Sequence, residues 1–301
     1  MYHILSCDQF ARDDLERIFK LTDDIRTNPE RFTTSLQGKL VATVFYEPST
    51  RTRLSFEAAV LRLGGKIIST ENAKEMSSVI KGESLFDTIR VIGGYCDAIV
   101  LRHPERQSAA DAASVARVPI INAGSGSGEH PTQALLDVYT VYKYKKTLDG
   151  LSIAVMGDLL FGRTVHSLVK LLALYKDVTI YGLSRDVLAL PEEYVVYLEE
   201  RGVRYIPCRS FEELPYDLDV LYHTRTQTER FHTDLQVEEF IIDPEVMKRF
   251  SDRTILLHPL PRRHEISPAV DTDSRAAYFA QSHNGMYVRM SLLHSIIGTS
   301  F

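Results

Sequence analysis

The sequence contains no tryptophan and only three cysteines in 301 residues. Cys7, Cys96 and Cys208 are far apart and form no CxxC pair. This spacing argues against a disulfide framework and against a cysteine-based zinc or redox site. We therefore expect three buried, reduced thiols in a protein of the cytosol.

Long apolar runs and an excess of basic residues are absent as well. No window approaches the roughly 18 apolar residues that a membrane-spanning helix needs, and acidic residues interrupt positions 1–20. We expect neither a signal peptide nor a membrane anchor. The net charge of −5, with no basic face, argues against a nucleic-acid-binding surface. With 44% apolar and 25% charged residues, the composition is typical of a soluble, globular protein, which we place in the cytoplasm.

Segments rich in β-formers alternate with helical segments along most of the chain. The predicted strands fall into two runs, 39–46, 66–70, 97–102 and 118–122, followed by 151–157, 177–182, 203–207, 218–223 and 253–259. The predicted helices between them are 51–63, 82–94, 105–116, 131–145, 163–175 and 191–201. Alternation of this kind indicates parallel sheets covered by helices on both faces.

Because the pattern runs twice, we expect an α/β protein with two doubly wound parallel-sheet domains. The first domain is predicted to span 1–145 and the second 146–284, with no low-complexity linker between them. The final segment, 285–301, reads as an amphipathic helix with no strand after it. We expect this helix to pack back on the first domain.

The stretch "FYEPSTRTR", residues 45–53, follows the first predicted strand. Ligands of open α/β sheets bind beyond the carboxyl ends of strands, and residues 49–53 supply three hydroxyls and two guanidiniums there. Ser49 suits a helix N-cap, whose free N–H groups attract an anion. Together with Thr50, Arg51 and Thr52 it favours a phosphate dianion. The alternative is an ordinary capped helix with solvated arginines, because no Gly-rich P-loop is present.

Further polar motifs follow other predicted strands. "LRHP" (101–104) places Arg102 at a strand end, and "HPTQ" (130–133) opens a helix with a proline at its first position. The corresponding motifs of the second half are "GDLLFGRTVHS" (157–167), "TRTQTER" (224–230) and "HPLPRRHE" (258–265). The first of these lacks GxGxxG, which argues against an NAD cofactor. One arginine at a strand end is usually structural, but five such loops in two domains indicate an anionic ligand.

Taken in order, a set of motifs resembles that of aspartate carbamoyltransferase catalytic chains across nearly the whole sequence. The motifs are "STRTR", "SSVIKGES", "LRHP", "HPTQALLD", "GDLLFGRTVHSL", "TRTQTER" and "HPLPR". The related ornithine carbamoyltransferases typically carry HCLP where this chain has "HPLP" (258–261), and they lack the TRxQxER stretch. The resemblance therefore implies aspartate as the acceptor, with another amine such as ornithine as the alternative. A non-catalytic trimeric scaffold is a second alternative, against which the intact motifs argue.

The resemblance implies a transfer of the carbamoyl group from carbamoyl phosphate to L-aspartate, an early step of pyrimidine synthesis, with no cofactor. A phosphate dianion and two carboxylates need clustered Arg, Lys and N–H donors, which these motifs contain. The amine attacks directly, and the departing phosphate can take its proton. No covalent intermediate is needed, so positioning and electrostatics supply most of the catalysis.

The resemblance also implies roles for individual residues. Ser49, Thr50, Arg51 and Thr52 would hold the phosphate. Thr52, Arg102 and His130 would polarise the carbamoyl carbonyl. The carbamoyl NH2 would meet Gln133 and the turn of Pro259, Leu260 and Pro261, whose first two backbone carbonyls accept from it. The implied aspartate-binding residues are Lys81, Arg163, Arg225 and Gln227, and the implied catalytic residues are Arg51, Thr52, Lys81, Arg102 and His130.

Two histidine-containing motifs leave alternatives. His130 could be a general base, but a neutral imidazole that donates to the carbonyl oxygen fits better, because a charged ring would sit among arginines. His258, His264 and Glu265 are close in sequence, yet their proline-containing loop has no ligand spacing of a known metal site. We expect no metal.

The segment "KEMSSVIKGE" (74–83) has few apolar anchors and reads as a mobile loop, with an ordinary surface connection as the alternative. The resemblance implies that Ser77 and Lys81 reach the active site of a neighbouring subunit in a homotrimer. Whether a regulatory chain also binds is open.

Glu47 stands two residues before Ser49, where a carboxylate would oppose phosphate binding unless it were engaged elsewhere. The resemblance suggests that it pairs with Arg163 and Arg230 when the domains close. The alternative is that Glu47 caps or solvates its own helix.

Overall fold

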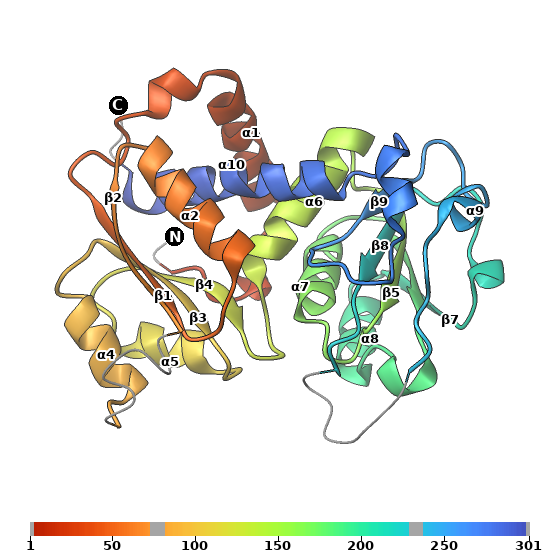
Figure 1. Ribbon diagram of the computed structural model, residues 1–301, viewed down its shortest axis with the longest axis horizontal. Helices are drawn as coiled ribbons and strands as arrows, with labels where there is room; N and C mark the ends of the chain where they lie inside the picture. Colours follow the sequence, from red (N-terminus) through yellow and green to blue (C-terminus); the bar gives the residue numbers. More distant parts are fainter. Residues whose placement is uncertain (1–2, 73–81, 229–236, 299–301) are drawn as a thin grey trace. The chain divides into compact units, whose positions relative to one another are not determined.

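The computed structural model describes residues 3–72, 82–228 and 237–298. The chain divides into two compact units, one formed by 1–135 with 283–301 and the other by 136–282. The two divisions fall inside helix α6 (Pro131–Lys145) and inside helix α10 (Tyr278–Ile297). Each unit contains one parallel sheet, labelled in Figure 1.

The sheet of the first unit has the strand order β2-β1-β3-β4. Its strands are β1 (Leu40–Phe45), β2 (Lys66–Glu71), β3 (Ala98–His103) and β4 (Ile120–Ser125). All neighbours pair in parallel, so the loops after β1, β3 and β4 leave from the same edge. Phe45 pairs with Arg102 in register, which sets the ends of β1 and β3 side by side.

Helices cover both faces of this sheet, as Figure 1 shows. Helix α2 (Thr50–Arg62) lies on one face, and α4 (Leu85–Ile92) and α5 (Ser108–Val115) lie on the other. Strands β1, β3 and β4 are buried along most of their length, as expected for a parallel sheet between helices, whereas the edge strand β2 is exposed or half-buried. Ala42, Val44, Ile99 and Leu101 pack with Ile89 and Ala112 in the core beneath α4 and α5.

The terminal helix returns to the first unit, as the sequence predicts. In the part of α10 beyond residue 282, Ser291 accepts a hydrogen bond from Thr22 at 3.1 Å, and Asn284 accepts one from Arg26. Both partners belong to α1 (Arg12–Thr27), a helix that was not predicted. The apolar residues of α1 recur at helical spacing and are buried, namely Leu15, Ile18, Phe19 and Ile25.

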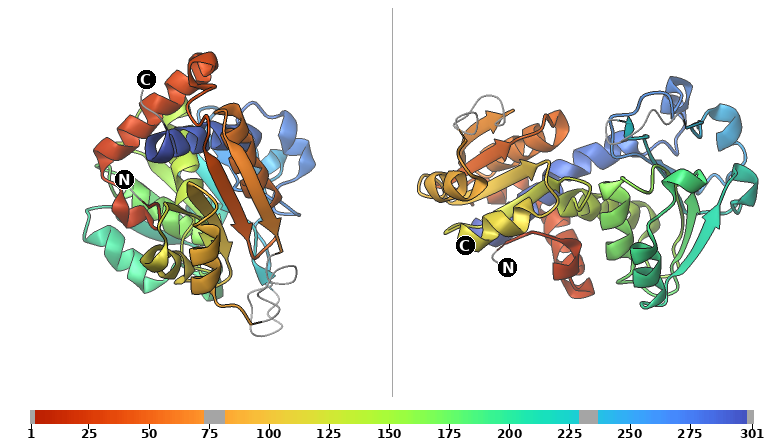
Figure 2. Two further views of the ribbon diagram at one scale, coloured as in Figure 1. Left: turned by 90° about the vertical axis from the view of Figure 1, so that its left-hand side faces the viewer. Right: turned by 90° about the horizontal axis from the view of Figure 1, so that it is seen from below.

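The sheet of the second unit has the order β7-β6-β5-β8-β9, again parallel throughout. Its strands are β5 (Ser152–Gly157), β6 (Thr179–Leu183), β7 (Arg204–Cys208), β8 (Val220–Thr224) and β9 (Ile255–Leu257). Its helices are α7 (Arg163–Leu172), α8 (Glu192–Glu199) and α9 (Pro244–Met247). Figure 2 shows the strands of both units from two other sides, where the twist of each sheet is visible.

The described chain also contains five short 3-10 helices. They are Cys7–Gln9, Pro29–Phe32, Asp186–Leu188, Phe211–Glu213 and Pro268–Thr272. The two-domain parallel α/β fold is thus confirmed, with shifts at several ends. Strand β4 begins and ends later than predicted, β9 is shorter, and α10 begins at Tyr278 rather than at 285.

All three cysteines lie in the described chain, and none is in a disulfide. Cys7 and Cys208 are buried, whereas Cys96 is only half-buried, which corrects the prediction for that residue. Burial raises the pKa of the Cys96 thiol to about 11 and also raises the pKa of Cys208. Of the helices in the described residues, none is both long and apolar enough to span a membrane.

Candidate functional site

The phosphate motif lies in the loop between β1 and α2 of the first unit. Ser49 is the N-cap residue of α2, as predicted, although its side chain makes no capping hydrogen bond. Thr50 and Arg51 occupy the first turn and are exposed, whereas Thr52 is buried. The first N–H groups of an α-helix have no partner inside the helix, so this turn offers backbone and side-chain donors together.

Thr52 and His130 meet although 78 residues separate them in the sequence. The Thr52 hydroxyl oxygen lies 3.4 Å from His130 Nε2, and both residues are buried. His130 directly precedes α6, and its carbonyl accepts from the N–H of Gln133 at 3.0 Å. The ends of β1 and β4 therefore place the predicted hydroxyl, imidazole and amide at one edge of the first sheet.

Arg102 stands near the end of β3, the strand between β1 and β4. Its Nη1 donates to the Ala123 carbonyl at 3.3 Å, and its Nε lies 3.4 Å from a carboxylate oxygen of Glu47. Glu47 therefore contacts a predicted active-site arginine of its own unit. The predicted bridge from Glu47 to Arg163 and Arg230 stays a prediction. Arg230, Ser77 and Lys81 lie outside the described residues.

In the second unit, the predicted aspartate-binding residues follow β5 and β8, which are neighbours in the sheet. Arg163 is the first residue of α7 and is buried. Arg225 and Gln227 follow β8, and Arg225 Nη1 donates to the Thr226 carbonyl at 3.1 Å. Gly157 at the end of β5 has φ +101°, and a Cβ there would lie 2.0 Å from the Thr224 carbonyl oxygen. Only glycine allows the two strand ends to approach this closely.

Asp158, which the sequence analysis did not single out, joins these two loops. It is fully buried, and its two carboxylate oxygens accept from the N–H of Phe161 at 2.9 Å and of Gln227 at 3.0 Å. A buried carboxylate needs such donors to offset its desolvation. Asp158 thus links the loop that leads to Arg163 with the backbone of Gln227. The available signal was an acid directly after a strand that ends in glycine.

The turn after β9 has an unusual backbone at Leu260. This residue has φ +55°, and the Leu260–Pro261 peptide is cis. The left-handed region costs a residue with a side chain roughly 1–2 kcal/mol, so other interactions must hold the turn. His258 Nδ1 accepts from the Leu260 N–H at 2.7 Å, and His258 Nε2 lies 2.9 Å from a Glu265 carboxylate oxygen.

Glu265 is buried with His258, and its second oxygen accepts from the Arg263 N–H at 2.9 Å. Burial by itself raises the pKa of this carboxyl, but the hydrogen bonds from His258 and from backbone N–H groups outweigh it and lower the pKa of Glu265. Both ring nitrogens of His258 are thus engaged in hydrogen bonds. His258 and Glu265, which the sequence analysis weighed and rejected as metal ligands, form a hydrogen-bonded support of the turn.

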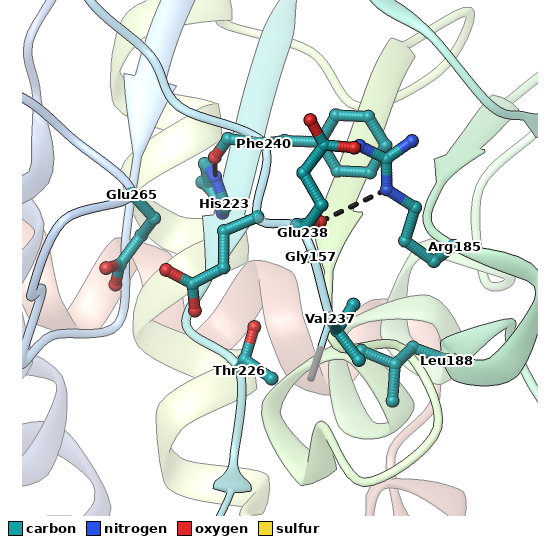
Figure 3. Close-up of a pocket in the computed structure, with 10 residues that line it drawn as sticks. Gly157, Arg185, Leu188, His223, Thr226, Val237, Glu238, Phe240 and Glu265 are labelled. Carbon is teal, nitrogen blue, oxygen red and sulfur yellow. Dashed lines mark hydrogen bonds and ion pairs between the residues drawn. The ribbon is translucent and has the colours of Figure 1, made fainter. Parts of the chain in front are cut away.

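Each unit has, among its described residues, a pocket with an acidic lining. The cavity in Figure 3 is at the carboxyl edge of the second sheet and, at about 10 Å³, has room for about one water. Its lining includes Glu238, Glu239 and Glu265, with Arg185 paired to Glu238 at 2.6 Å. The larger cavity, of about 300 Å³, belongs to the first unit and is lined by residues that include Tyr46, Glu83, His103, Glu105 and Asp111. Neither lining suits a phosphate or a carboxylate.

Comparisons with known proteins cover nearly the whole chain. The family model described as "Aspartate/ornithine carbamoyltransferase, carbamoyl-P binding domain" matches residues 2–143, and the companion "Asp/Orn binding domain" matches 149–296. The chain is similar to aspartate carbamoyltransferase 3, chloroplastic, of Pisum sativum, with 47% identity over 98% of this chain and 77% of that protein.

Two solved structures show the same similarity in three dimensions. The catalytic subunit of M. jannaschii aspartate transcarbamoylase is 44% identical, with a TM-score of 0.91 over 99% of this chain and 98% of that one. Aspartate transcarbamoylase from Trypanosoma cruzi, in complex with carbamoyl phosphate and aspartate, is 39% identical, with a TM-score of 0.92 over 98% and 97%.

Proposed function

Because the chain belongs to the aspartate/ornithine carbamoyltransferase family, we propose that it transfers the carbamoyl group of carbamoyl phosphate to the amino group of L-aspartate. The products are N-carbamoyl-L-aspartate and phosphate, in the synthesis of pyrimidines. The observation that carries the proposal is the meeting of Thr52 with His130 at 3.4 Å, beside Arg102 and the first turn of α2. The related T. cruzi enzyme binds both proposed substrates.

The first unit supplies the groups for carbamoyl phosphate. Ser49, Thr50 and Arg51 surround the N-terminus of α2, where the helix dipole and free N–H groups favour a phosphate. Thr52, Arg102 and a neutral His130 donate to the carbonyl oxygen as it gains charge in the transition state, the role of an oxyanion hole. The C–N bond forms as the C–O bond to phosphate breaks, and the phosphate takes the proton of the amine.

The second unit supplies the groups for aspartate. Arg163, Arg225 and Gln227 face the two carboxylates, because guanidinium groups match carboxylates with paired hydrogen bonds. The carbamoyl NH2 donates to the backbone carbonyls of Pro259 and Leu260, with Gln133 beside it. Holding two reactants in this way supplies much of the rate acceleration.

The test is an assay of the purified protein with carbamoyl phosphate and, in turn, aspartate, ornithine and putrescine. We expect carbamoyl aspartate as the product, with a kcat/KM for aspartate at least about 100-fold above that for the other amines. Arg225→Ala should raise the KM for aspartate, whereas the matched control Arg185→Ala, in the same unit but outside the proposed site, should not. A higher kcat/KM for ornithine would overturn the proposal.

We further propose a homotrimer in which Ser77 and Lys81 complete the site of a neighbouring subunit. Support comes from large apolar side chains that the first unit exposes on α2 and near α4, namely Leu54, Leu61, Phe86, Val91 and Tyr95. Light scattering should give three times the mass of one chain. Mixing Lys81→Ala with Arg51→Ala chains should restore part of the activity, and no recovery after verified exchange would contradict shared sites. A regulatory chain would add mass after incubation with cell extract.

The cytoplasm is the proposed compartment, supported by three thiols whose positions suit a reducing environment. The Pisum sativum relative is named chloroplastic, so cell fractionation with an antibody against this chain is the deciding measurement. Recovery with an organelle fraction would overturn the proposal.

A further inference from the structure

The turn at 258–261 has few backbone N–H groups that could stabilise it through hydrogen bonds. Strand β9 ends at Leu257, and two of the four turn residues, Pro259 and Pro261, have no N–H. The N–H of His258 donates to Gln281 Oε1 at 2.9 Å, and the N–H of Leu260 donates to His258 Nδ1 at 2.7 Å. Both backbone donors of the turn are therefore bound by side chains rather than by the sheet.

These contacts determine the tautomer of His258. A backbone N–H can only donate, so Nδ1 must be the acceptor, and the proton of the neutral ring lies on Nε2. From there it donates to Glu265, 2.9 Å away, whose other oxygen is held by the Arg263 N–H. The imidazole is thereby fixed in orientation from both sides, and the Leu260 N–H is fixed with it.

The support continues into the core through a directional series of hydrogen bonds. Because Gln281 accepts from His258 through Oε1, its amide nitrogen is free to donate, and it does so to Asp137 Oδ1 at 2.6 Å. Asp137 Oδ2 accepts from the Tyr222 hydroxyl at 2.8 Å. Burial, followed by the Asp137 carboxylate, raises the pKa of Tyr222 well above its usual range, so the hydroxyl stays a donor. We call this series, Tyr222–Asp137–Gln281–His258–Glu265, the buried relay.

We propose that the buried relay makes the enzyme selective for the carbamoyl group, with His258 and Glu265 as positioning residues. The relay engages the N–H groups of the turn and leaves the carbonyls of Pro259 and Leu260 outside it. In the proposed function, on which this inference rests, these carbonyls accept from the carbamoyl NH2. An acceptor pair that is rigidly aimed rejects an analogue without the N–H donors, whereas a loose pair does not.

Acetyl phosphate is the probe, because it has a methyl group where carbamoyl phosphate has NH2 and the same phosphate. The quantity to measure is the selectivity, defined as the Ki of acetyl phosphate divided by the KM of carbamoyl phosphate. His258→Gln keeps a donor toward Glu265 but removes the acceptor of the Leu260 N–H. We expect its selectivity to fall at least about tenfold, the effect of one well-made hydrogen bond. The affinity for inorganic phosphate should be unchanged.

A second variant separates the two sides of the ring. The amide oxygen of His258→Asn lies near the position of Nδ1, so it can still accept from Leu260 while losing Glu265. We expect it to retain more selectivity than His258→Gln. Should His258→Gln fail to fold, Glu265→Gln takes its place. Its selectivity should fall because Gln cannot accept from both His258 and Arg263. The fall should be smaller than that of His258→Gln because His258 Nδ1 is still present to accept from Leu260.

The control is Thr254→Val, at the residue directly before the same strand. Thr254 is fully buried and donates to the Leu218 carbonyl at 2.6 Å, outside the buried relay. Its loss should lower the melting temperature as a His258 variant does, but it should leave the selectivity unchanged. Unchanged selectivity in the His258 or Glu265 variants, with only a lower melting temperature, would overturn the positioning role. A wild-type enzyme that fails to use carbamoyl phosphate would instead overturn the proposed function, and this inference with it.

Discussion

The carboxyl edges of the two sheets are built in different ways. At the first edge, the predicted phosphate-binding groups are consecutive residues, and Thr50 and Arg51 are exposed at the start of α2. At the second edge, buried side chains support the loops through hydrogen bonds. Asp158 connects the loops after β5 and β8, and His258 with Glu265 supports the turn after β9. The first edge presents its donors directly, and the second depends on a supporting layer.

This contrast has a thermodynamic consequence. An exposed arginine loses little solvation on folding, so its removal changes ligand binding more than folding. A buried carboxylate loses its hydration and is stable only because N–H and imidazole donors replace the water. Substitutions of the exposed residues at the first edge should therefore separate activity from stability, whereas substitutions of the buried residues at the second edge should change both.

The largest effect is expected for Arg51→Ala at the first edge. Removal of a donor to the developing charge should lower kcat at least about 100-fold, with a melting temperature close to that of the wild type because the side chain is exposed. Arg53→Ala, two residues further along α2, is the opposite control. Arg53 contacts Glu71 at 2.8 Å and Glu57 at 3.3 Å, so its loss should lower stability and keep most of kcat. Arg51→Ala activity above a tenth of wild type would contradict the assignment.

Asp158→Asn should show the coupled behaviour of the second edge. One of the two backbone N–H groups, of Phe161 or Gln227, would lose its acceptor. We expect the KM for aspartate to rise about tenfold and the free energy of unfolding to fall by about 2 kcal/mol. Steady-state kinetics with each substrate varied, together with urea unfolding, measure both quantities. A change in stability with an unaltered KM would show that the carboxylate supports the fold alone.

The Glu47→Ala variant distinguishes a role of Glu47 at the edge of the first sheet alone from a role at the edges of both sheets. If Glu47 pairs with Arg163 and Arg230 on closure, the KM for aspartate should rise about fivefold, roughly 1 kcal/mol, with carbamoyl phosphate binding nearly unchanged. Small-angle scattering should also show less compaction with a bisubstrate analogue. A rise confined to the KM for carbamoyl phosphate would place its role at Arg102, the contact seen in the first unit.

The last prediction, with the smallest expected effect on activity, concerns stability. It is the pH dependence of the unfolding free energy that Glu265 contributes. Its folded pKa is about 2 against a usual value of 4.5, so the ionised form stabilises the fold fully above pH 4.5 and progressively less as the pH falls toward 2. Wild type should exceed Glu265→Gln in unfolding free energy by about 2–3 kcal/mol near pH 6. Urea unfolding between pH 6 and pH 3 should show this difference shrinking, and a constant difference would contradict the ion-dipole support.

Most strands and helices could be predicted because their apolar residues recur at the expected period. Two of the errors occur where buried residues are polar. Strand β4 was predicted to end at Asn122, where the apolar run stops, yet the strand continues to Ser125, and both of these polar residues are buried. Helix α10 was predicted to begin late because Gln281 and Asn284 face partners in the core with polar side chains. Helix α1 had a regular apolar pattern, so its omission was an error of interpretation.

The residues of the candidate site likewise fall into two groups, those that local sequence patterns reveal and those that they do not. The residues expected to touch substrates follow strand ends in short motifs, so they could be found from local patterns. The long-range pairings behind them could not, because the partners are distant in the chain, with Asp158 and Gln227 separated by 69 residues and Gln281 and Asp137 by 144. A single sequence contains no signal for such a pairing, since each member reads as an ordinary polar residue.

The division of the chain among the units also sets an order of events during synthesis. The first unit needs residues 283–301 as well as 1–135, so the ribosome makes the whole second unit before the first can be completed. At about 5–20 residues per second, that interval is roughly 10–30 seconds. Until then, Thr22 and Phe32 lack Ser291 and His294, their later partners. Of the two units, the first is therefore begun before the second and completed after it, and the surface that residues 283–301 cover stays exposed during this interval.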